Sequence, residues 1–283
     1  MNPLFRFLDC SIEAFCGAPL WRRECRVWDQ RMVSATFDRW LYLRLHKFGR
    51  MGGAERAALH RLVHPGMTVV DVGSNLGLYT VLLSRLVGPA GRVLAFEPDP
   101  DLFALLQRNG ALNGCHNVAS HNLALGSQRD RLLLHKMIVN SGDNHLGEGG
   151  SKLFRRTVET EVVSLDEFAP DLRPDFVKID VQGWELPVLR GMARLLKQHP
   201  PAGIYLEFWP EGFRRAGYAA DDVVAFLTSL GFHFQRADTL EALDPEALGA
   251  IAHRLTGLKH VDLYATRQPL PEQPGESGSD KCG

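Results

Sequence analysis

The sequence predicts an α/β fold built on a mainly parallel, seven-stranded sheet flanked by helices. Short β-branched apolar runs alternate with longer segments of helical periodicity, which is typical of a parallel sheet. Several of these runs end at an acidic or amide residue, and ligands of such folds bind at the carboxyl ends of the strands. The 283 residues, 45% of them hydrophobic and 23% charged, are enough for one large domain and an N-terminal helical appendage.

Charge and cysteine content exclude several classes of protein. The formal net charge of −1 gives no electrostatic basis for nucleic acid as a partner. The five cysteines form no C-x-x-C pair and the eleven histidines are scattered, so neither a disulfide framework nor a zinc site is predicted. No apolar run reaches membrane-spanning length, and the first ten residues lack the apolar region of a signal peptide. We therefore expect a cytoplasmic protein without a membrane partner.

Residues 1–65 are predicted to form the N-terminal helical segment. The segment is rich in aromatic residues and arginine, and Leu41, Leu45 and Phe48 recur at helical spacing. Two or three helices that pack on the main domain explain this pattern, and a lid that shapes a binding pocket is the alternative. A further helix over residues 55–63 leads into the main domain.

The main domain, 66–267, begins with a strand, a tight turn and a helix. Residues 68–79 read T-V-V-D-V-G-S-N-L-G-L-Y, and the helical pattern continues to Val87, before Gly88-Pro89. Gly73 and Gly77 lack Cβ atoms, which lets a ligand approach the backbone, and the start of the helix offers free N–H groups.

A second strand, over 92–98, ends in Glu97 and Pro98, and an acid at this position can accept the two hydroxyls of a ribose. Asp99 is then expected to cap a helix that extends to Leu112. The third strand covers 118–125. Asn122 near its tip is either a contact for an adenine ring or an ordinary turn residue.

The glycine spacing distinguishes between cofactors. The G-x-G-x-x-G fingerprint of dinucleotide-binding proteins is absent, which argues against a nucleotide-dependent oxidoreductase. Asp71 precedes a G-x-x-x-G instead, and its carboxylate suits the ammonium and sulfonium groups of S-adenosylmethionine better than a pyrophosphate. The residues predicted to bind this cofactor are Asp71, Gly73, Ser74, Asn75, Gly77, Glu97, Pro98 and Asn122.

The remaining elements follow from the same patterns. Short strands over 131–137 and 158–163 flank a polar loop over 140–150, which is either a disordered surface loop or a loop that contacts a substrate. Ser164 and Glu167 have capping-box spacing. The later elements are, in order, a strand over 176–181, a helix over 184–196, a strand over 203–208, a helix from Asp221 to Gly231, and strands over 232–236 and 261–266. Residues 268–283 are rich in Pro, Gly, Ser and Glu and are predicted to be disordered.

Four motifs in this order resemble the FkbM-type S-adenosylmethionine-dependent methyltransferases. They are D-V-G-S-N-L-G from Asp71, A-F-E-P from Ala95, S-L-D-E-F from Ser164 and K-I-D-V-Q-G-W-E from Lys178. The resemblance extends from about Gly66 to Trp209 and implies the class I methyltransferase, or Rossmann-like, fold. This sequence departs from the usual pattern of the family at Ser74, where Ala is common, and at Gln182, where Glu is common.

Methyl transfer to a hydroxyl benefits from a base beside the acceptor. Asp180 is the predicted base or acceptor-orienting residue, with Glu207 and His145 as further candidates, because the tips of neighbouring strands meet at one rim. Hydrogen bonding of Asp180 to loop amides or to Lys178 is the alternative. Asp180 and Glu207 could also share a divalent ion, but no third ligand is evident, so no metal is predicted.

The sequence thus predicts transfer of a methyl group to a hydroxyl of a small molecule or glycan in natural-product metabolism. The acceptors of the family that the chain resembles include sugar and polyketide hydroxyls and, in some members, peptide nitrogen. N-methylation of a peptide or amine nitrogen is therefore one alternative. A cofactor-binding but inactive partner subunit is the other, and Gln182 is the one feature that favours it. The sequence indicates no oligomeric state.

Overall fold

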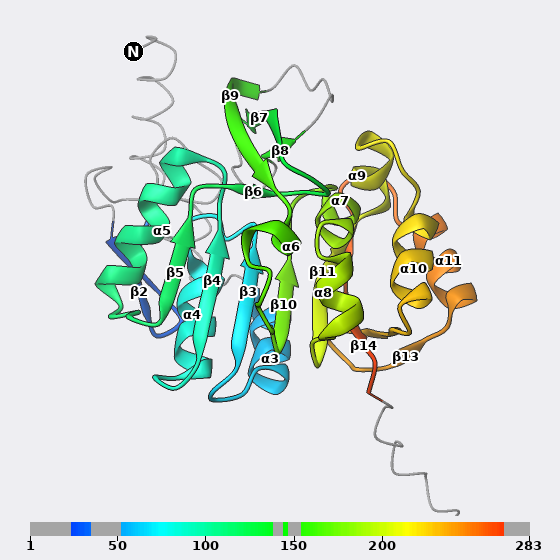
Figure 1. The fold of residues 1–283 in the computed structure, drawn as a ribbon, viewed down its shortest axis with the longest axis horizontal. Coiled ribbons are helices and arrows are strands. Elements are labelled where there is room, and N and C mark those ends of the chain that lie inside the picture. Colours follow the sequence, from blue (N-terminus) through cyan, green and yellow to red (C-terminus); the bar gives the residue numbers. More distant parts are fainter. Residues whose placement is uncertain (1–23, 35–51, 138–143, 147–153, 269–283) are drawn as a thin grey trace, which may run out of the picture.

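The computed structural model describes residues 24–34, 52–137, 144–146 and 154–268. Their centre is an eight-stranded sheet with helices on both faces (Figure 1). The order of its strands is β5 (Val118–His121) next to β4 (Arg92–Phe96), β3 (Thr68–Val72), β10 (Phe176–Ile179), β11 (Gly203–Phe208), β14 (Val261–Thr266), β12 (His233–Arg236) and β13 (Ala242–Leu243). The order reverses at β3, which has β4 on one side and β10 on the other.

The mainly parallel α/β sheet predicted from the sequence is confirmed, with one difference in the number of strands. Strands β5, β4, β3, β10 and β11 are parallel, whereas β14 runs antiparallel to both β11 and β12. The eighth strand, β13, pairs antiparallel with β12. It was not predicted because two residues, Ala242 and Leu243, carry no recognisable period.

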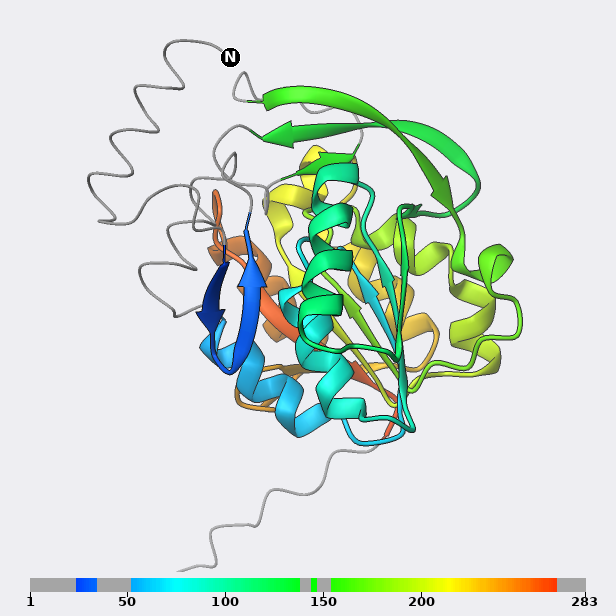
Figure 2. The same cartoon turned by 90° about the vertical axis from the view of Figure 1, so that its left-hand side faces the viewer.

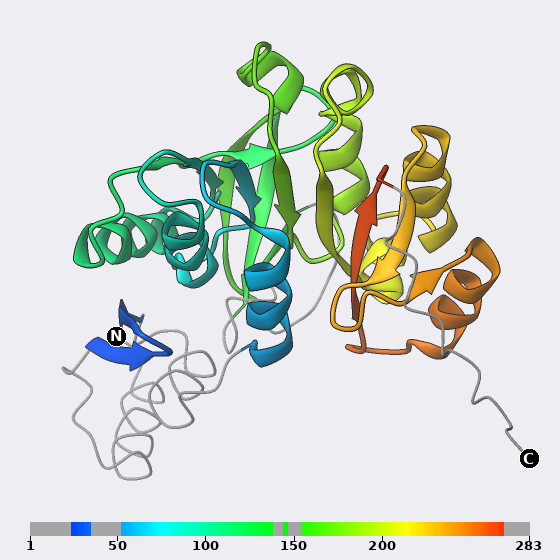
Figure 3. The same ribbon diagram turned by 90° about the horizontal axis from the view of Figure 1, so that it is seen from below.

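Two helical layers enclose the sheet. Helices α3 (Gly53–Leu62), α4 (Leu78–Val87) and α5 (Pro100–Leu112) cover one face, and α7 (Glu185–Arg190), α8 (Ala193–Gln198) and α10 (Ala220–Ser229) cover the other (Figures 1 and 3). The remaining helices are α6 (Leu165–Phe168), α9 (Pro210–Arg215) and α11 (Pro245–Arg254). Alternate residues of each inner strand face opposite layers, and those of β3 and β10 form the centre of the core. No helix in the described ranges is long and apolar enough to cross a membrane.

Two predicted helix starts are confirmed at the level of single hydrogen bonds. The Asp99 side chain accepts the N–H of Asp101 at the start of α5, and Ser164 accepts the N–H of Glu167 at the start of α6. The prediction of a single helix over 184–196 is wrong, because α7 and α8 are separate helices with Gly191 and Met192 between them. A Cβ on Gly191 would lie 1.8 Å from the carbonyl oxygen of Gly126, so the backbones approach closely at this break.

A second, four-stranded sheet arches over the carboxyl ends of the first (Figures 1 and 2). Its order is β6 (Ala124–Leu125), β9 (Phe154–Val163), β7 (Asp130–Met137) and β8 (His145–Leu146). The strand predicted over 118–125 therefore belongs to two sheets, as β5 and β6. The predicted loop over 140–150 contains strand β8, and its residues 140–143 and 147–150 lie outside the described residues.

The N-terminal segment differs from the prediction. Residues 24–33 form an antiparallel hairpin of β1 (Glu24–Val27) and β2 (Gln30–Val33) rather than helices. Buried Asn109 of α5 fixes the hairpin, since its side chain accepts the Val33 N–H at 2.7 Å and donates to the Val33 carbonyl at 3.0 Å. The helix predicted over 55–63 is confirmed as α3. The other predicted helices, including Leu41, Leu45 and Phe48, and all but the first residue of the predicted tail lie outside the described residues.

Candidate functional site

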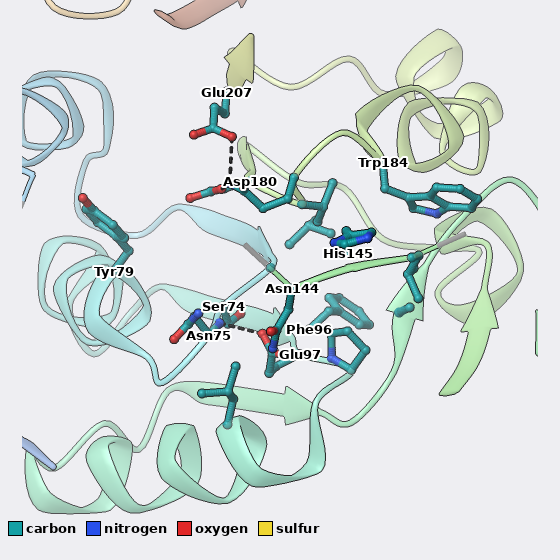
Figure 4. Close-up of a pocket in the computed structure, with 18 of the residues that line it drawn as sticks. Ser74, Asn75, Tyr79, Phe96, Glu97, Asn144, His145, Asp180, Trp184 and Glu207 are labelled. Atoms are coloured by element: carbon teal, nitrogen blue, oxygen red, sulfur yellow. Dashed lines mark hydrogen bonds between the residues drawn. The ribbon is translucent and has the colours of Figure 1, made fainter. Parts of the chain in front are cut away.

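A cavity of about 390 Å³ lies where the strand order of the main sheet reverses. Its walls come from the ends of β3, β4, β10 and β11, from the start of α4, and from β8 of the arching sheet (Figure 4). The volume is in the range of small-molecule sites, which in open α/β sheets occupy this position. Of the predicted site residues, Gly73, Ser74, Asn75, Glu97, Pro98, His145, Asp180 and Glu207 line the cavity.

The turn after β3 is held against β4 by main-chain hydrogen bonds. Gly73 and Ser74 donate to the carbonyl oxygen of Phe96, each at 3.0 Å. Gly73 has a φ of 81° and Gly77 a φ of 90°, which favours glycine at both positions. A Cβ on Gly73 would lie 1.9 Å from the carbonyl oxygen of Asp180, and one on Gly77 would lie 2.7 Å from a methyl of Leu106. Both glycines are therefore needed for packing, and Gly77 does not line the cavity.

Glu97 is fixed in the wall of the cavity at the end of β4. Its side chain is 5% exposed, and its two oxygens accept the N–H of Asn75 at 2.7 Å and the N–H of Asp99 at 2.9 Å. Burial raises the pKa of Glu97 to about 8. The two backbone N–H donors lower this pKa, but their effect is smaller than that of burial. A carboxylate oxygen has two lone pairs, so each oxygen retains one acceptor site. In its ionised form Glu97 is thus arranged to accept two neighbouring hydroxyl groups, and hydroxyls that donate to it would favour that form.

The wall beyond Glu97 is apolar. Its residues are Phe96, Pro98, Leu102, Leu123, Ala124, Leu125, Leu134, Leu146 and Trp184. Asn122 does not line the cavity, because its side chain donates to the carbonyl oxygens of Glu97 at 2.8 Å and Pro98 at 3.1 Å. The structure thus shows Asn122 bonded within the turn, and the apolar wall is where a planar ring would fit.

A buried ion pair connects the arching sheet to the Glu97 loop. Lys136 of β7 is 2% exposed, and its ammonium contacts Asp99 at 2.5 Å and Asp101 at 2.6 Å. Asn144 donates to the second oxygen of Asp99 at 3.0 Å. Sequence reasoning missed Lys136, although its period-2 spacing from buried Leu134 places both on the inner face of β7. This network holds one wall of the cavity against the other.

Asp71 lies beneath the cavity rather than in its wall. Its side chain is fully buried, accepts the Thr80 hydroxyl at 2.6 Å and lies 3.9 Å from the ammonium of Lys178. Lys178 also contacts Asp180 at 3.3 Å. Burial alone would lower the pKa of Lys178, but Asp180 and Asp71 outweigh it and raise that pKa to about 12. Asp71 therefore holds the lysine that holds Asp180.

The polar end of the cavity contains Asp180 and Glu207 (Figure 4). The side-chain amide of Gln182 donates to both, at 3.2 Å to Asp180 and 2.8 Å to Glu207. Glu207 also faces His260 at 3.5 Å. Burial, followed by the negative charge of Asp180, raises the pKa of Glu207 well above its ordinary value. Asp180 was predicted either to act as a base or to bond to Lys178 or loop amides, and the contact with Lys178 is observed. Asp180 also lies in the cavity wall, so its role as a base can be tested.

Two further residues complete the cavity. His145 of β8 lies in the wall between the polar and apolar ends and stacks on His135, with ring centroids 5.3 Å apart (Figure 4). Tyr79 of α4, which sequence reasoning did not select, donates its hydroxyl to Glu55 at the polar end. The residues described in the structure contain no group of three or more His, Cys, Asp or Glu side chains that could hold a metal ion.

The buried acids make stability depend on pH. Glu185 is fully buried, accepts the N–H groups of Val181 and Gly183, and has a pKa raised by burial to about 8. Between pH 4.5 and 8 the folded protein binds more protons than the unfolded chain at this residue, so the free energy of unfolding falls as pH rises through that window. We expect Glu185→Gln to remove up to about 1.4 kcal/mol per pH unit from this slope.

Urea unfolding at pH 5.5, 6.5 and 7.5 tests this expectation. The matched control is Glu246→Gln, which changes an exposed glutamate in the first turn of α11 and should leave the slope unchanged. Parallel pH curves for wild type and Glu185→Gln would show that Glu185 is ionised in the folded protein.

Comparison with known proteins identifies the family. The Methyltransferase FkbM domain matches residues 71–234, more than half of the chain. "Methyltransferase 1" of Beauveria bassiana is 32% identical over 144 residues, which cover 44% of this chain and 57% of that protein. The hexuronic acid methyltransferase AglP of Haloferax volcanii is 31% identical over 127 residues, 45% of this chain and 50% of that protein. The chain thus spans little more than half the length of these relatives.

The solved structures that resemble this chain are more distant. A putative rRNA-methylase from Clostridium thermocellum is 15% identical with a TM-score of 0.46, and the match covers 76% of this chain and 93% of that one. Similarity of this degree says nothing about substrate. The match over residues 71–234 contains both the turn after β3 and the polar end of the cavity at Asp180 and Glu207. The chain belongs to the FkbM methyltransferase family.

Proposed function

We propose that the protein is an S-adenosylmethionine-dependent methyltransferase that acts on a hydroxyl of a small molecule or glycan. The observation that carries the proposal is the arrangement of Glu97, which is fixed by two backbone N–H groups and keeps one acceptor site on each oxygen. An acid in this position at the end of the second strand suits the two hydroxyls of a ribose. The family to which the chain belongs supports the same chemistry.

The cavity fits the cofactor in three parts. The apolar wall around Phe96 and Leu123 suits the adenine ring, and Glu97 suits the ribose. The turn of Gly73, Ser74 and Asn75 would lie beside the methionine part. Asp71 is buried below the cavity, so its effect on a positively charged cofactor would be indirect, through Lys178 and Asp180. When bound, S-adenosylmethionine supplies an electrophilic methyl group.

The residues of the polar end would prepare the acceptor. Asp180 is 36% exposed at its side chain, so it can hydrogen-bond an acceptor hydroxyl and take its proton. Lys178 holds one oxygen of Asp180 and Gln182 the other, which fixes the direction of the carboxylate. Glu207, whose pKa is raised by burial, is the second group able to receive the proton. Orientation of the acceptor is the main contribution that we assign to this end.

The class of acceptor follows from charge. An anionic acceptor would meet the carboxylate of Asp180 as a like charge, so a neutral sugar or natural-product hydroxyl fits better than a uronate. The relative named for hexuronic acid supports a sugar as the acceptor class without fixing its charge. N-methylation of a peptide or amine remains the second candidate, because the same carboxylates would bind an amine. An inactive partner subunit is the third, and turnover against an acceptor panel separates it from the other two.

Replacement of Glu97 tests the cofactor. We expect Glu97→Gln to weaken S-adenosylmethionine binding at least tenfold by calorimetry, since one charge-assisted hydrogen bond contributes roughly 1.5–3 kcal/mol. Glu97→Ala should weaken it further and also lower the melting temperature, because Asn75 and Asp99 lose the acceptor of their N–H groups. Glu161→Gln on the arching sheet is the control, and NADH should not bind. Unchanged affinity in Glu97→Gln would contradict the assignment of the ribose site.

A further inference from the structure

Gln182 has a backbone conformation that is unfavourable for glutamine. Its φ is 54°, in the left-handed region, and the next residue, Gly183, has a φ of 96°. A Cβ on Gly183 would lie 2.6 Å from the backbone of Gly212, so the turn is packed against α9. Glycine would adopt the conformation of Gln182 at less cost. Strained residues of this kind concentrate at functional sites, where the side chain compensates for the backbone.

The side chain of Gln182 explains why glutamine occupies this turn. Its Nε2 atom lies 3.2 Å from Oδ1 of Asp180 and 2.8 Å from Oε2 of Glu207. An amide nitrogen has two hydrogens, so one group donates to both acids at once. The other oxygen of Asp180 faces Lys178 and the other oxygen of Glu207 faces His260. Both carboxyl groups of the polar end are therefore held at two points each.

The charge of residue 182 matters as much as its hydrogen bonds. Carboxylates that are close together disfavour one another's ionised form. A neutral amide between Asp180 and Glu207 donates to both and adds no charge, whereas a glutamate at 182 would place a third carboxylate between them. The titratable groups that act electrostatically on or with Asp180 are Asp71, Tyr79, Lys178, Glu185, Glu207 and Asp262. Lys178 is the one cation among these six, and His260 faces Glu207 from outside the group, so a further carboxylate at 182 would add to an end in which acids outnumber basic groups.

We infer that Gln182 is a positioning residue that joins Asp180 and Glu207 into one unit and keeps a third acidic side chain out of the acceptor end. The inference rests on the proposed function in one respect, namely that Asp180 is the base. Its structural part does not depend on that role. The charge of residue 182 then acts on both carboxyl groups of the acceptor end through the hydrogen bonds that its side chain makes to them.

Three variants test the inference. Gln182→Glu adds the third carboxylate, Gln182→Glu combined with Glu207→Gln restores the original number of acids, and Gln182→Gly relieves the backbone strain while it removes the amide. The titration of the Asp180 carboxyl is followed by carbon NMR on protein labelled at aspartate, without cofactor or acceptor. We expect Gln182→Glu to raise the midpoint of Asp180 by about one pH unit or more, and the double variant to return it towards the wild-type value.

Kinetics give the second readout. The acid limb of the pH–rate profile should move upward in Gln182→Glu with the NMR midpoint, while cofactor affinity stays within about threefold. Gln182→Gly should keep or raise the melting temperature and lower the rate constant at least about fivefold. An unchanged Asp180 midpoint in Gln182→Glu, or a wild-type rate constant in Gln182→Gly, would overturn the inference. Wild-type binding of S-adenosylmethionine in both Glu97 variants would instead contradict the proposed function. The failure of the inference and the failure of the proposed function can therefore be told apart.

Discussion

Asp180→Asn is expected to lower the rate constant for methyl transfer to a hydroxyl by about 100-fold or more, with cofactor affinity within about threefold of wild type. Asparagine keeps the size of aspartate and can still accept a hydrogen bond, but it cannot take a proton at neutral pH. The side chain lies in the cavity wall beside Glu207 and outside the turn that would hold the cofactor. Single-turnover kinetics with a confirmed hydroxyl acceptor measure the effect.

The control for this variant is Asp221→Asn, in the exposed first turn of α10, which should keep the wild-type rate. A nitrogen acceptor provides a second comparison, because a neutral amine needs no base to become nucleophilic, so the loss should be smaller. Equal turnover of wild type and Asp180→Asn on a hydroxyl would leave Asp180 as the partner of Lys178 and Gln182 alone. Glu207 and then His145 would be the next bases to test.

Gly73→Ala is expected to cost roughly 2–5 kcal/mol of folding free energy and to abolish measurable cofactor binding. Alanine is disfavoured at a φ of 81°, and its Cβ would lie 1.9 Å from the carbonyl oxygen of Asp180. Either the turn or the end of β10 must move, and both line the cavity. Gly73→Val places a larger, branched side chain at the same position and should be destabilised further. Urea unfolding and calorimetry with S-adenosylmethionine measure the two effects.

Gly249→Ala is the matched control, because nothing lies within 4 Å of a Cβ at this position in α11. Alanine there should be neutral or stabilise the protein by up to about 1 kcal/mol. Wild-type stability and binding in Gly73→Ala would mean that the backbone at β3 and β10 adapts without cost, contrary to the close packing observed.

The parts of the site that the sequence predicted are those that depend on where a strand ends. Glu97, Asp180 and Glu207 each lie at or beside the end of a strand of the main sheet, and a parallel sheet brings such ends to one rim whatever the side-chain directions. Ser164 and Asp99 were predictable for a similar reason, since a cap depends only on neighbouring residues.

The parts that were not predictable depend on side-chain direction and on contacts between distant segments. Asp71 is one residue short of the end of β3 and pairs in register with Lys178, so its side chain packs under the sheet rim against Thr80. Asn122 turns back onto the Glu97 loop. The contact of Lys136 with Asp99 joins residues 37 positions apart, and no local pattern specifies it. The hairpin of residues 24–33 depends in the same way on Asn109.

The position of β14 has a consequence for the folding of the chain during synthesis. The last strand of the described residues lies inside the sheet, between β11 and β12, so these two strands lack the neighbour between them until residues 261–266 have been made. Because ribosomes add about 5–20 residues per second, one edge of β11 stays unpaired for roughly 3–12 seconds during synthesis. A chain that stops before Val261 would expose two unpaired strand edges, which invite pairing with other chains. Nascent-chain arrest at residue 255 should therefore give a species that binds chaperones, whereas arrest after the whole domain has emerged should not.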